Sequence, residues 1–266
     1  VGNANAADEA ITAAATVIRL SSDNGRLVQN PLETRGYVGL WDADAECYTL
    51  HAAAGKPQTV GRDLAQFVFG LPEDSVRAVT KDVGGGFGAK NPLYPEQALV
   101  LWTAKKLDRP VSWQSSRSET FLADYQGRGQ AADAEMALDK NGNVLALRIN
   151  ILADLGAFLG PRGSTAPNMW RTMGASVYDL PVVDYNVRAI HTHNMPTCPY
   201  RGAGAPEAVF IIERLFDMAA AELGLSAGDI RRKNLIPADA MPFKTAIGTT
   251  LDSGDFAQVM NSAERM

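Results

Sequence analysis

Gly84-Gly85-Gly86-Phe87-Gly88-Ala89-Lys90 is the stretch that says most about this chain. Glycine packs no side chain and loses more conformational freedom on folding than any other residue, so three in a row need a reason in the backbone. We interpret that reason as close approach of main-chain N–H groups to an anionic or polar group. A second glycine-rich stretch, residues 199–207, reads Pro-Tyr-Arg-Gly-Ala-Gly-Ala-Pro-Glu. Two such loops predict one site built from distant parts of the chain.

Three interpretations compete for the first glycine loop. A dinucleotide-binding fingerprint, Gly-x-Gly-x-x-Gly, does not fit the spacing, because the last glycine arrives one residue early at Gly88. A phosphate-binding P-loop needs Ser or Thr directly after a Gly-Lys pair, whereas this loop ends Ala89-Lys90-Asn91. The third alternative is a flexible turn, and Phe87 argues against it because a plain linker would not contain an aromatic residue.

The second glycine loop also has a simple structural interpretation. Arg201 could cap or pair with Glu207, and Gly202 and Gly204 could be turn residues ahead of a helix. However, the loop precedes the longest predicted helix, 206–223, and the free N–H groups of a helix N-terminus favour anions. Arg201 adds a forked donor that suits phosphate or carboxylate. We therefore favour a binding role for this loop over a plain turn.

The composition excludes several classes of protein. The net charge of −5 over 266 residues gives a nucleic-acid role no electrostatic support. Cys47 and Cys198 are the only cysteines, so this chain alone cannot hold an iron–sulfur cluster, which takes about four thiolates. They also argue against a disulfide framework. No apolar run is long enough to span a bilayer, and residues 1–14 lack the basic start and apolar centre of a signal peptide. We expect a cytoplasmic location.

The predicted elements mix helices and strands without regular alternation. We predict strands over 16–20, 37–40, 47–50, 76–83, 111–114, 131–138, 144–153 and 187–193. We predict helices over 7–14, 63–69, 95–106, 206–223, 226–233 and 253–266. In the helix over 95–106, Ala98, Leu99 and Trp102 fit the 3.6-residue period of an apolar face. Asn141-Gly142 predicts a tight hairpin turn. This order indicates an α+β fold with mixed sheets and packed helices.

These residues resemble a known family, the molybdenum-binding large subunit of the xanthine dehydrogenase, aldehyde oxidase and carbon monoxide dehydrogenase enzymes. Residues 83–90 are similar to its Gly-Gly-Gly-Phe-Gly-x-Lys loop, and residues 200–208 to its second active-site loop. Shorter similar stretches follow the family's order along the chain, and they lie at 30–33, 117–119, 154–158, 232–237 and 241–256. The resemblance covers almost the whole chain.

The resemblance implies that residues 1–240 form the first molybdopterin-binding domain and that residues 241–266 begin the second. It implies a molybdopterin cofactor with molybdenum, in some members as the cytosine dinucleotide, that hydroxylates aldehydes or N-heterocycles with oxygen from water. Electrons would pass to iron–sulfur and FAD partners on other chains or domains. Ala203 would also line the substrate pocket, and no side chain would ligate the metal directly. The residues implied to contact the cofactor are Gly85, Gly86, Phe87, Gly88, Arg201, Gly202 and Ala203.

Three departures from the family pattern qualify this interpretation. Gly55 stands where many members have a glutamine beside the metal, and Gln58 is offset from that place. Ala203 leaves more room than the aromatic residue that xanthine-type enzymes have at this position. Gly202 stands where the copper-containing carbon monoxide dehydrogenases have a cysteine, and the absence of that thiol disfavours carbon monoxide as substrate. The family's general-base glutamate lies beyond this chain, so we expect an incomplete site whose remaining half of the large subunit comes from elsewhere. The alternative is a non-catalytic or assembly-only relic that binds no cofactor.

Other candidate residues have simpler interpretations. His191 and His193 share one face of a predicted strand, but no third zinc ligand is in view, so we interpret them as exposed polar residues. We interpret Glu96 as a charge at a helix N-terminus rather than a catalytic acid. The acidic residues Asp133, Glu135 and Asp139 fit a solvated hairpin face. The four tryptophans fit core or interface positions: Trp41, Trp102, Trp113 and Trp170.

The chain starts at Val1 and its last predicted helix is short, so both ends resemble boundaries inside a longer polypeptide.

Overall fold

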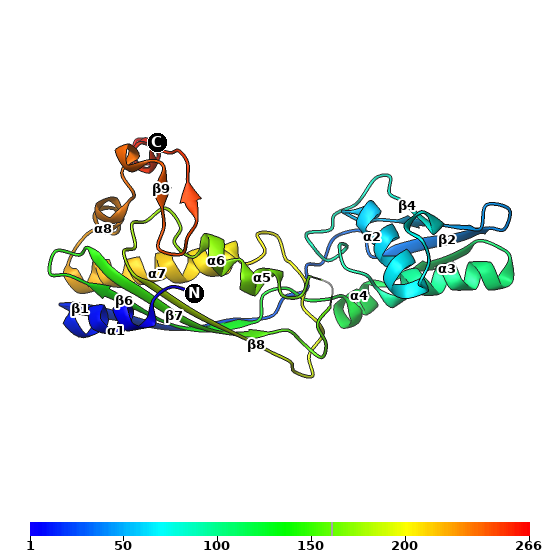
Figure 1. The fold of residues 1–266 in the computed structure, drawn as a ribbon, viewed down its shortest axis with the longest axis horizontal. Helices are drawn as coiled ribbons and strands as arrows, with labels where there is room; N and C mark the ends of the chain where they lie inside the picture. The colour runs from blue at the N-terminus through cyan, green and yellow to red at the C-terminus, as the bar shows by residue number, and fades with distance from the viewer. Residues whose placement is uncertain (161) are drawn as a thin grey trace.

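The computed structural model describes residues 1–160 and 162–266, and it contains two four-stranded sheets at opposite ends of an elongated molecule (Figure 1). The larger sheet has the strand order β1-β6-β7-β8. Its strands are β1 (Thr16–Asn24), β6 (Gln130–Leu138), β7 (Val144–Asp154) and β8 (Val183–Ile190). The smaller sheet has the order β4-β3-β2-β5. Its strands are β2 (Gly36–Asp42), β3 (Cys47–Ala52), β4 (Val76–Val79) and β5 (Val111–Gln114). Sheets that each mix antiparallel and parallel pairs, with packed helices, confirm the predicted α+β class.

The larger sheet has a helix packed on each of its two faces. Helix α7 (Ala205–Leu223) packs its apolar stripe on one face, where Ile212, Leu215 and Phe216 are fully buried against alternate residues of β6 and β7. Helix α1 (Ala4–Ala13) lies against β7 and β8 on the other side, as Figure 1 shows. The chain can end α7 sharply because Gly224 takes the left-handed conformation that glycine tolerates.

The smaller sheet packs against helix α3 (Pro95–Leu107) through an unusually close contact. A Cβ atom on Gly39 of β2 would lie 2.6 Å from the main chain of Val100, so only glycine lets the helix sit this close. Leu101, Leu50 and Tyr37 complete this core. Helix α2 (Pro57–Asp63) continues as a π-helical turn, Leu64–Phe69, and ends at Gly70, which also has a left-handed backbone.

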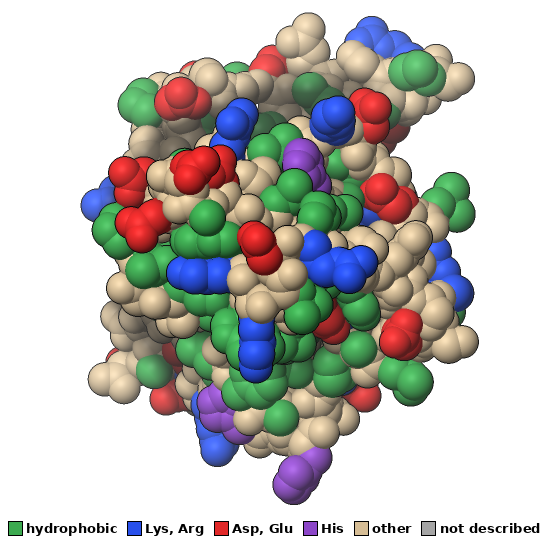
Figure 2. All heavy atoms as spheres, turned by 90° about the vertical axis from the view of Figure 1, so that its right-hand side faces the viewer, with side chains coloured by type: hydrophobic (Ala, Val, Ile, Leu, Met, Phe, Trp, Pro, Cys, Tyr) green, Lys and Arg blue, Asp and Glu red, His purple; other side chains and the backbone are tan. Residues whose placement is uncertain are grey.

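The close contact at Gly39 decides which face of α3 is buried, and the prediction of an apolar face through Leu99 and Trp102 was wrong. Val100 and Leu101 point inward, whereas Leu99 and Trp102 are 56% and 51% exposed. The Lys106 ammonium lies 4.8 Å from the centre of the Trp102 ring. Figure 2 views the end of the molecule that carries the smaller sheet, where apolar side chains are interspersed with basic ones.

The remaining elements are short. They are the helices α4 (Arg117–Ala123), α5 (Thr165–Asn168), α6 (Trp170–Met173), α8 (Ala227–Asn234) and α9 (Phe256–Glu264), the 3-10 turns Glu73–Ser75 and Ala238–Ala240, and the strands β9 (Phe243–Lys244) and β10 (Thr250–Leu251). Several predicted elements had wrong bounds, among them two strands. The strand predicted over 76–83 ends at Val79, because its partner β3 ends in the same register. The strand predicted over 187–193 begins earlier, at Val183, and ends at Ile190, where its partner β7 ends.

Candidate cofactor site

The two glycine loops meet in space, as the sequence predicted. The Arg201 N–H donates a hydrogen bond to the Phe87 carbonyl oxygen at 3.0 Å. A Cβ atom on Gly88 would lie 1.7 Å from the carbonyl oxygen of Pro199, which no real side chain could do. Gly88 is therefore required for the approach of one loop to the other, and this reason for a glycine is visible only in the structure.

Both loops contain backbone conformations that L-residues rarely adopt. Phe87 has φ of 49° and Ala203 has φ of 46°, and the neighbouring Gly88 and Gly202 have φ of 108° and 95°. A non-glycine residue in this region costs about 1–3 kcal/mol and persists only where its surroundings hold it there. The loops are thus shaped by their contacts and not by local preference.

Several main-chain donors of the two loops have no acceptor within the described residues. Five of them are the N–H groups of Gly85, Gly86, Phe87, Gly88 and Gly202. None of these residues lies in a helix or strand, so no regular ladder accounts for them. Unpaired N–H groups on successive residues form a concave donor surface that suits an anionic or oxygen-rich group.

Glu33 holds the first loop from the side. Its carboxylate accepts from the Gly84 N–H at 2.8 Å and from the Lys90 ammonium at 2.6 Å, and its own N–H donates to the Gly84 carbonyl. Lys90 is buried and paired here, so this lysine braces the loop. Arg117 in turn donates to the Pro31 and Leu32 carbonyl oxygens at 2.8 and 2.7 Å. Two stretches that stood out in the sequence therefore support the loop rather than line it.

Acid is expected to loosen this brace. Burial acts to raise the pKa of Glu33, but the hydrogen bonds from Lys90 and Gly84 outweigh it and hold the pKa below its ordinary value of 4.5. A group with a lowered folded-state pKa stabilises the fold above its unfolded pKa and loses that effect as the pH falls through the folded value. We expect Glu33→Gln to lower stability by about 1 kcal/mol at neutral pH, a small value because the carboxylate is partly exposed. Melting temperatures of the protein against pH would test this, and a gap between variant and wild type that stays constant from pH 7 to pH 3 would contradict it.

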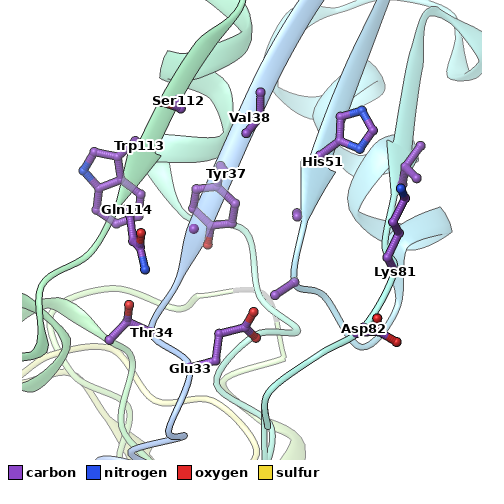
Figure 3. Close-up of a pocket in the computed structure, with 14 residues that line it drawn as sticks. Glu33, Thr34, Tyr37, Val38, His51, Lys81, Asp82, Ser112, Trp113 and Gln114 are labelled. Atoms are coloured by element: carbon purple, nitrogen blue, oxygen red, sulfur yellow. The ribbon is translucent and has the colours of Figure 1, made fainter.

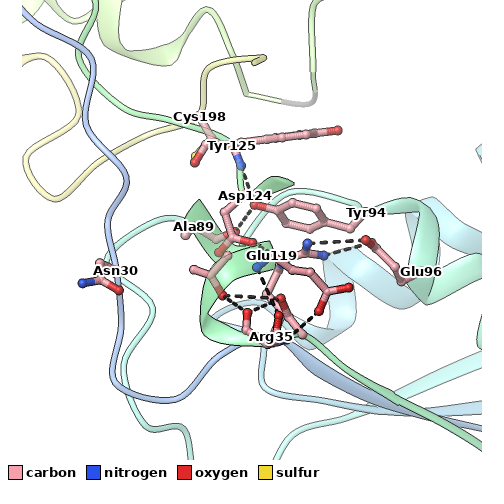
Figure 4. Close-up of polar contacts among 12 residues, drawn as sticks. Asn30, Arg35, Ala89, Tyr94, Glu96, Glu119, Asp124, Tyr125 and Cys198 are labelled. Atoms are coloured by element: carbon pink, nitrogen blue, oxygen red, sulfur yellow. Dashed lines mark hydrogen bonds and ion pairs between the residues drawn. The ribbon is translucent and has the colours of Figure 1, made fainter. Parts of the chain in front are cut away.

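A buried arginine cluster supports the same loop from below (Figure 4). Arg35 is 1% exposed and pairs through Nε with Asp124 Oδ1 at 2.6 Å and through Nη1 with Glu96 Oε2 at 2.9 Å. Its guanidinium carbon lies 3.8 Å from the centre of the Tyr94 ring. The Tyr94 hydroxyl donates to the Ala89 carbonyl oxygen at 2.8 Å. Glu96 is thus a partner of Arg35, a role that its position at a helix start did not reveal.

Tyr94 also links the first loop to the segment beneath the second. Its hydroxyl oxygen accepts from the Tyr125 N–H at 3.1 Å, and the Tyr125 carbonyl oxygen lies 3.7 Å from the Cys198 sulfur, just before the second loop. Burial holds the pKa of the Tyr94 phenol well above its ordinary value, so the hydroxyl keeps its proton and remains a donor. Burial likewise raises the pKa of the Cys198 thiol, to about 12, which makes it unreactive.

The suggested pairing of Arg201 with Glu207 is wrong. Glu207 pairs with Arg128 at 3.0 Å, and sequence reasoning missed Arg128 because only the fold brings it to this loop. Within the described residues the Arg201 guanidinium makes no hydrogen bond or ion pair, and the residue is exposed. The site therefore offers one uncommitted cation beside the unpaired N–H groups.

Gly55, one of the positions that depart from the family pattern, lies at the site's edge. A Cβ atom on Gly55 would lie 2.4 Å from the Asn91 side-chain oxygen, so Asn91 fills the space that a side chain at this position would need. The Asn91 N–H donates to the Gly88 carbonyl oxygen, which ties this residue to the first loop. Gln58 is exposed on α2. His191 and His193 are exposed beyond the end of β8, in agreement with their interpretation as surface residues.

A groove of about 460 Å³, lined by both polar and apolar residues, begins beside Glu33 and runs over the open face of the smaller sheet (Figure 3). Val38, His51 and Gln114 line it, together with Lys81. None of the five unpaired N–H groups borders this groove, so it is a neighbour of the loops and not the space they enclose.

In the part of the chain that the structure describes, no three His, Cys, Asp or Glu residues group as a metal site, and no helix has the length and apolar character to cross a membrane.

Comparison with known proteins identifies the family. A family profile described as the molybdopterin cofactor-binding domain matches residues 1–235. The chain belongs to this family. The molybdopterin cofactor-binding domain is 34% identical over 232 residues to the carbon monoxide dehydrogenase large chain of Hydrogenophaga pseudoflava, covering 85% of this chain and 28% of that protein. It is 29% identical over 262 residues to the nicotine 6-hydroxylase large subunit of Paenarthrobacter nicotinovorans, covering 97% and 32%.

A solved structure shares the fold of this molybdopterin cofactor-binding domain. Quinoline 2-oxidoreductase from Pseudomonas putida 86 superposes with a TM-score of 0.90 at 31% identity, covering 97% of this chain and 33% of the other. The chain therefore spans about a third of the length of the relatives it matches. The donor set of the two loops fits a molybdopterin cofactor, because main-chain N–H groups and one guanidinium suit oxygen-rich, anionic acceptors.

Proposed function

We propose that residues 1–240 are the first molybdopterin-binding domain of the large subunit of a molybdenum hydroxylase, and that residues 241–266 begin the second. The observation that carries this proposal is the hydrogen bond from Arg201 to Phe87, which joins two glycine loops and leaves a group of unpaired N–H groups beside them. The similarity to large subunits of such enzymes over most of this chain supports it.

The cofactor, when bound, would supply the oxidation of an aldehyde or N-heterocyclic carbon with oxygen from water. The residues of this chain would hold and orient it. The N–H groups of Gly85, Gly86, Phe87, Gly88 and Gly202 would donate to its oxygen or sulfur acceptors, and Arg201 would offer a cation. Glu33 and Lys90 keep the first loop in shape from behind. The general base is expected from the rest of the large subunit, which does not lie in this chain.

The substrate we propose is an N-heterocycle or an aldehyde. Relatives named for nicotine and quinoline support a ring substrate, and the small side chain of Ala203 in the second loop leaves room for one. A relative named for carbon monoxide is also similar, but Gly202 provides no thiol at the loop, so we do not favour that gas. Iron–sulfur and FAD subunits are the partners we propose, in the cytoplasm, with the cytosine dinucleotide as one form of the pterin.

Gly86→Ala is the variant that separates cofactor binding from folding. A Cβ atom on Gly86 would meet nothing closer than 3.8 Å, and Gly86 does not have a positive φ, so the fold accepts alanine. If the unpaired N–H groups face the cofactor, a methyl group among them weakens its binding. We expect molybdenum and pterin in the purified complex to fall by about tenfold, as for one lost charge-assisted contact, at an unchanged melting temperature.

Gly25→Ala is the matched control, because Gly25 has nothing within 4 Å and lies outside both loops. It should leave the molybdenum content at the wild-type value. If the complexes of Gly86→Ala and Gly25→Ala contain equal amounts of molybdenum, the first loop is not part of the cofactor site. A wild-type complex that holds neither molybdenum nor pterin would favour the non-catalytic relic.

A further inference from the structure

Arg128 makes three contacts with the second glycine loop and its helix. Its Nη1 pairs with the Glu207 carboxylate at 3.0 Å, and its Nη2 donates to the Arg201 carbonyl oxygen at 3.1 Å. Its guanidinium carbon lies 4.7 Å from the centre of the Tyr200 ring. Arg128 itself has φ of 65°, a strained conformation for arginine. One side chain is thus committed to three neighbouring parts of the loop.

The residues on either side of Arg128 allow this approach. A Cβ atom on Gly127 would lie 2.4 Å from the Tyr200 Cβ, so a larger residue would push the two segments apart. Gly129 has φ of 76°, which favours glycine. The segment is therefore built to bring the arginine against the loop.

Glu207 depends on Arg128 for its charge balance. It lies in the first turn of α7 and is 2% exposed, and its second oxygen, Oε1, has no partner among the described residues. Glu207 lines a small cavity of about 10 Å³ together with Gln130, whose side-chain Nε2 also has no partner among the described residues. A space of that size suits a single water, which could bridge the two groups. Arg128 is the only cation paired with this buried carboxylate in the described structure.

The hydrogen bond to the Arg201 carbonyl fixes a peptide plane. A trans peptide is planar, with its C=O and N–H pointing in opposite directions. When Arg128 holds the Arg201 oxygen, the Gly202 N–H of the same peptide is directed away from Arg128. The preceding peptide is fixed as well, because the Arg201 N–H is bonded to Phe87. The unpaired Gly202 donor therefore has a direction set by contacts on both sides.

We propose that Arg128 is a positioning residue that orients the Arg201–Gly202 peptide, and with it the Gly202 N–H, without touching the cofactor. The expected effect of Arg128 on the cofactor rests on the proposed function, whereas its expected effect on the loop does not. Lysine would keep the charge beside Glu207 but could not hold the carboxylate and the carbonyl together, because its ammonium lacks the fork of two donors.

The experiment compares Arg128→Lys with Glu207→Gln in the full large subunit, purified in its complex. Amide hydrogen exchange is measured over residues 199–205, where the Arg201 and Ala203 N–H groups are bonded. We expect Arg128→Lys to raise exchange of these amides by about fivefold, the factor for one lost hydrogen bond, with little change in melting temperature. We expect Glu207→Gln, which keeps the bond from Arg128 to Arg201, to leave loop exchange near the wild-type rate. In a molybdenum-loaded complex Arg128→Lys should also alter the Mo(V) electron paramagnetic resonance signal.

Arg188→Lys is the matched control, since Arg188 is exposed on β8 and has no ion pair among the described residues. Loop exchange in Arg128→Lys equal to that in Arg188→Lys would overturn the proposal. A complex without molybdenum would count against the proposed function and still leave this exchange test decisive. Faster exchange with an unchanged Mo(V) signal in a loaded complex would overturn the link between the loop and the cofactor.

Discussion

Replacing Gly88 with alanine is expected to separate the two glycine loops and to remove molybdenum from the complex. The new Cβ would lie 1.7 Å from the Pro199 oxygen and 2.7 Å from its carbonyl carbon, and these are main-chain atoms that cannot rotate away. The backbone at Gly88, with φ of 108°, adds strain of about 1–3 kcal/mol for any residue with a side chain. As the loops part, the Arg201–Phe87 hydrogen bond is lost, at a cost of about 1 kcal/mol.

Gly248→Ala separates the steric effect from the strain in this experiment. Gly248 has a comparable φ of 87°, but a Cβ there would meet nothing within 4 Å. It should lower the melting temperature of the large subunit modestly and leave its molybdenum and pterin content unchanged. Gly88→Ala should lower both, with a molybdenum loss of tenfold or more, on the order of one or two lost contacts. If the two variants retain equal molybdenum, the contact between the loops is not needed for the cofactor.

The convergence of the loops could be predicted because it depends on residue types that few other structures require. A run of glycines interrupted by Phe87 excludes a plain linker, and the ends of helices at Gly70 and Gly224 follow from the left-handed conformation that glycine accepts. These are local properties, readable from a few consecutive residues. The specific reason for Gly88 was not local, because the atom that excludes a side chain belongs to Pro199.

The braces of the site could not be predicted for the same reason. Glu33 reaches Lys90, and Arg128 reaches Glu207, across separations that only the folded topology closes. In the same way, the buried face of α3 was misassigned because Gly39, on another element, determines how the helix rests on its sheet. Sequence patterns identified which loops matter, while the groups that hold them in place depend on long-range pairing.

Arg35→Met is expected to be the most destabilising change to these braces. Arg35 and Asp124 are each 1% exposed, and Asp124 Oδ2 already lacks a partner within the described residues. Removing the arginine leaves a buried carboxylate without its cation, which costs about 3–5 kcal/mol. The Tyr94 ring loses one of its packing partners too, and Tyr94 carries the hydrogen bond to Ala89 of the first loop. We therefore expect a lower melting temperature of the large subunit together with a lower molybdenum content.

The pH dependence of this variant follows from the same carboxylate. Burial raises the pKa of Asp124 above its ordinary value of 3.8 even with Arg35 present, and without Arg35 the pKa should rise further. A folded state that holds a proton more tightly than the unfolded state gains stability as the pH falls. The gap in melting temperature between Arg35→Met and wild type should therefore narrow from pH 8 to pH 5.

Two further variants test whether the unpaired charge is the cause. Arg19→Met removes an exposed arginine that pairs with Glu135 at 2.9 Å, and it should cost no more than about 1 kcal/mol. An Arg35→Met variant no less stable than Arg19→Met would show that burial of the pair has no energetic consequence. The double variant Arg35→Met/Asp124→Leu removes both charges, so it should be more stable than Arg35→Met alone. If it is not, the loss arises from packing against Tyr94, and the first loop depends on the ring of Tyr94 more than on the charge beneath it.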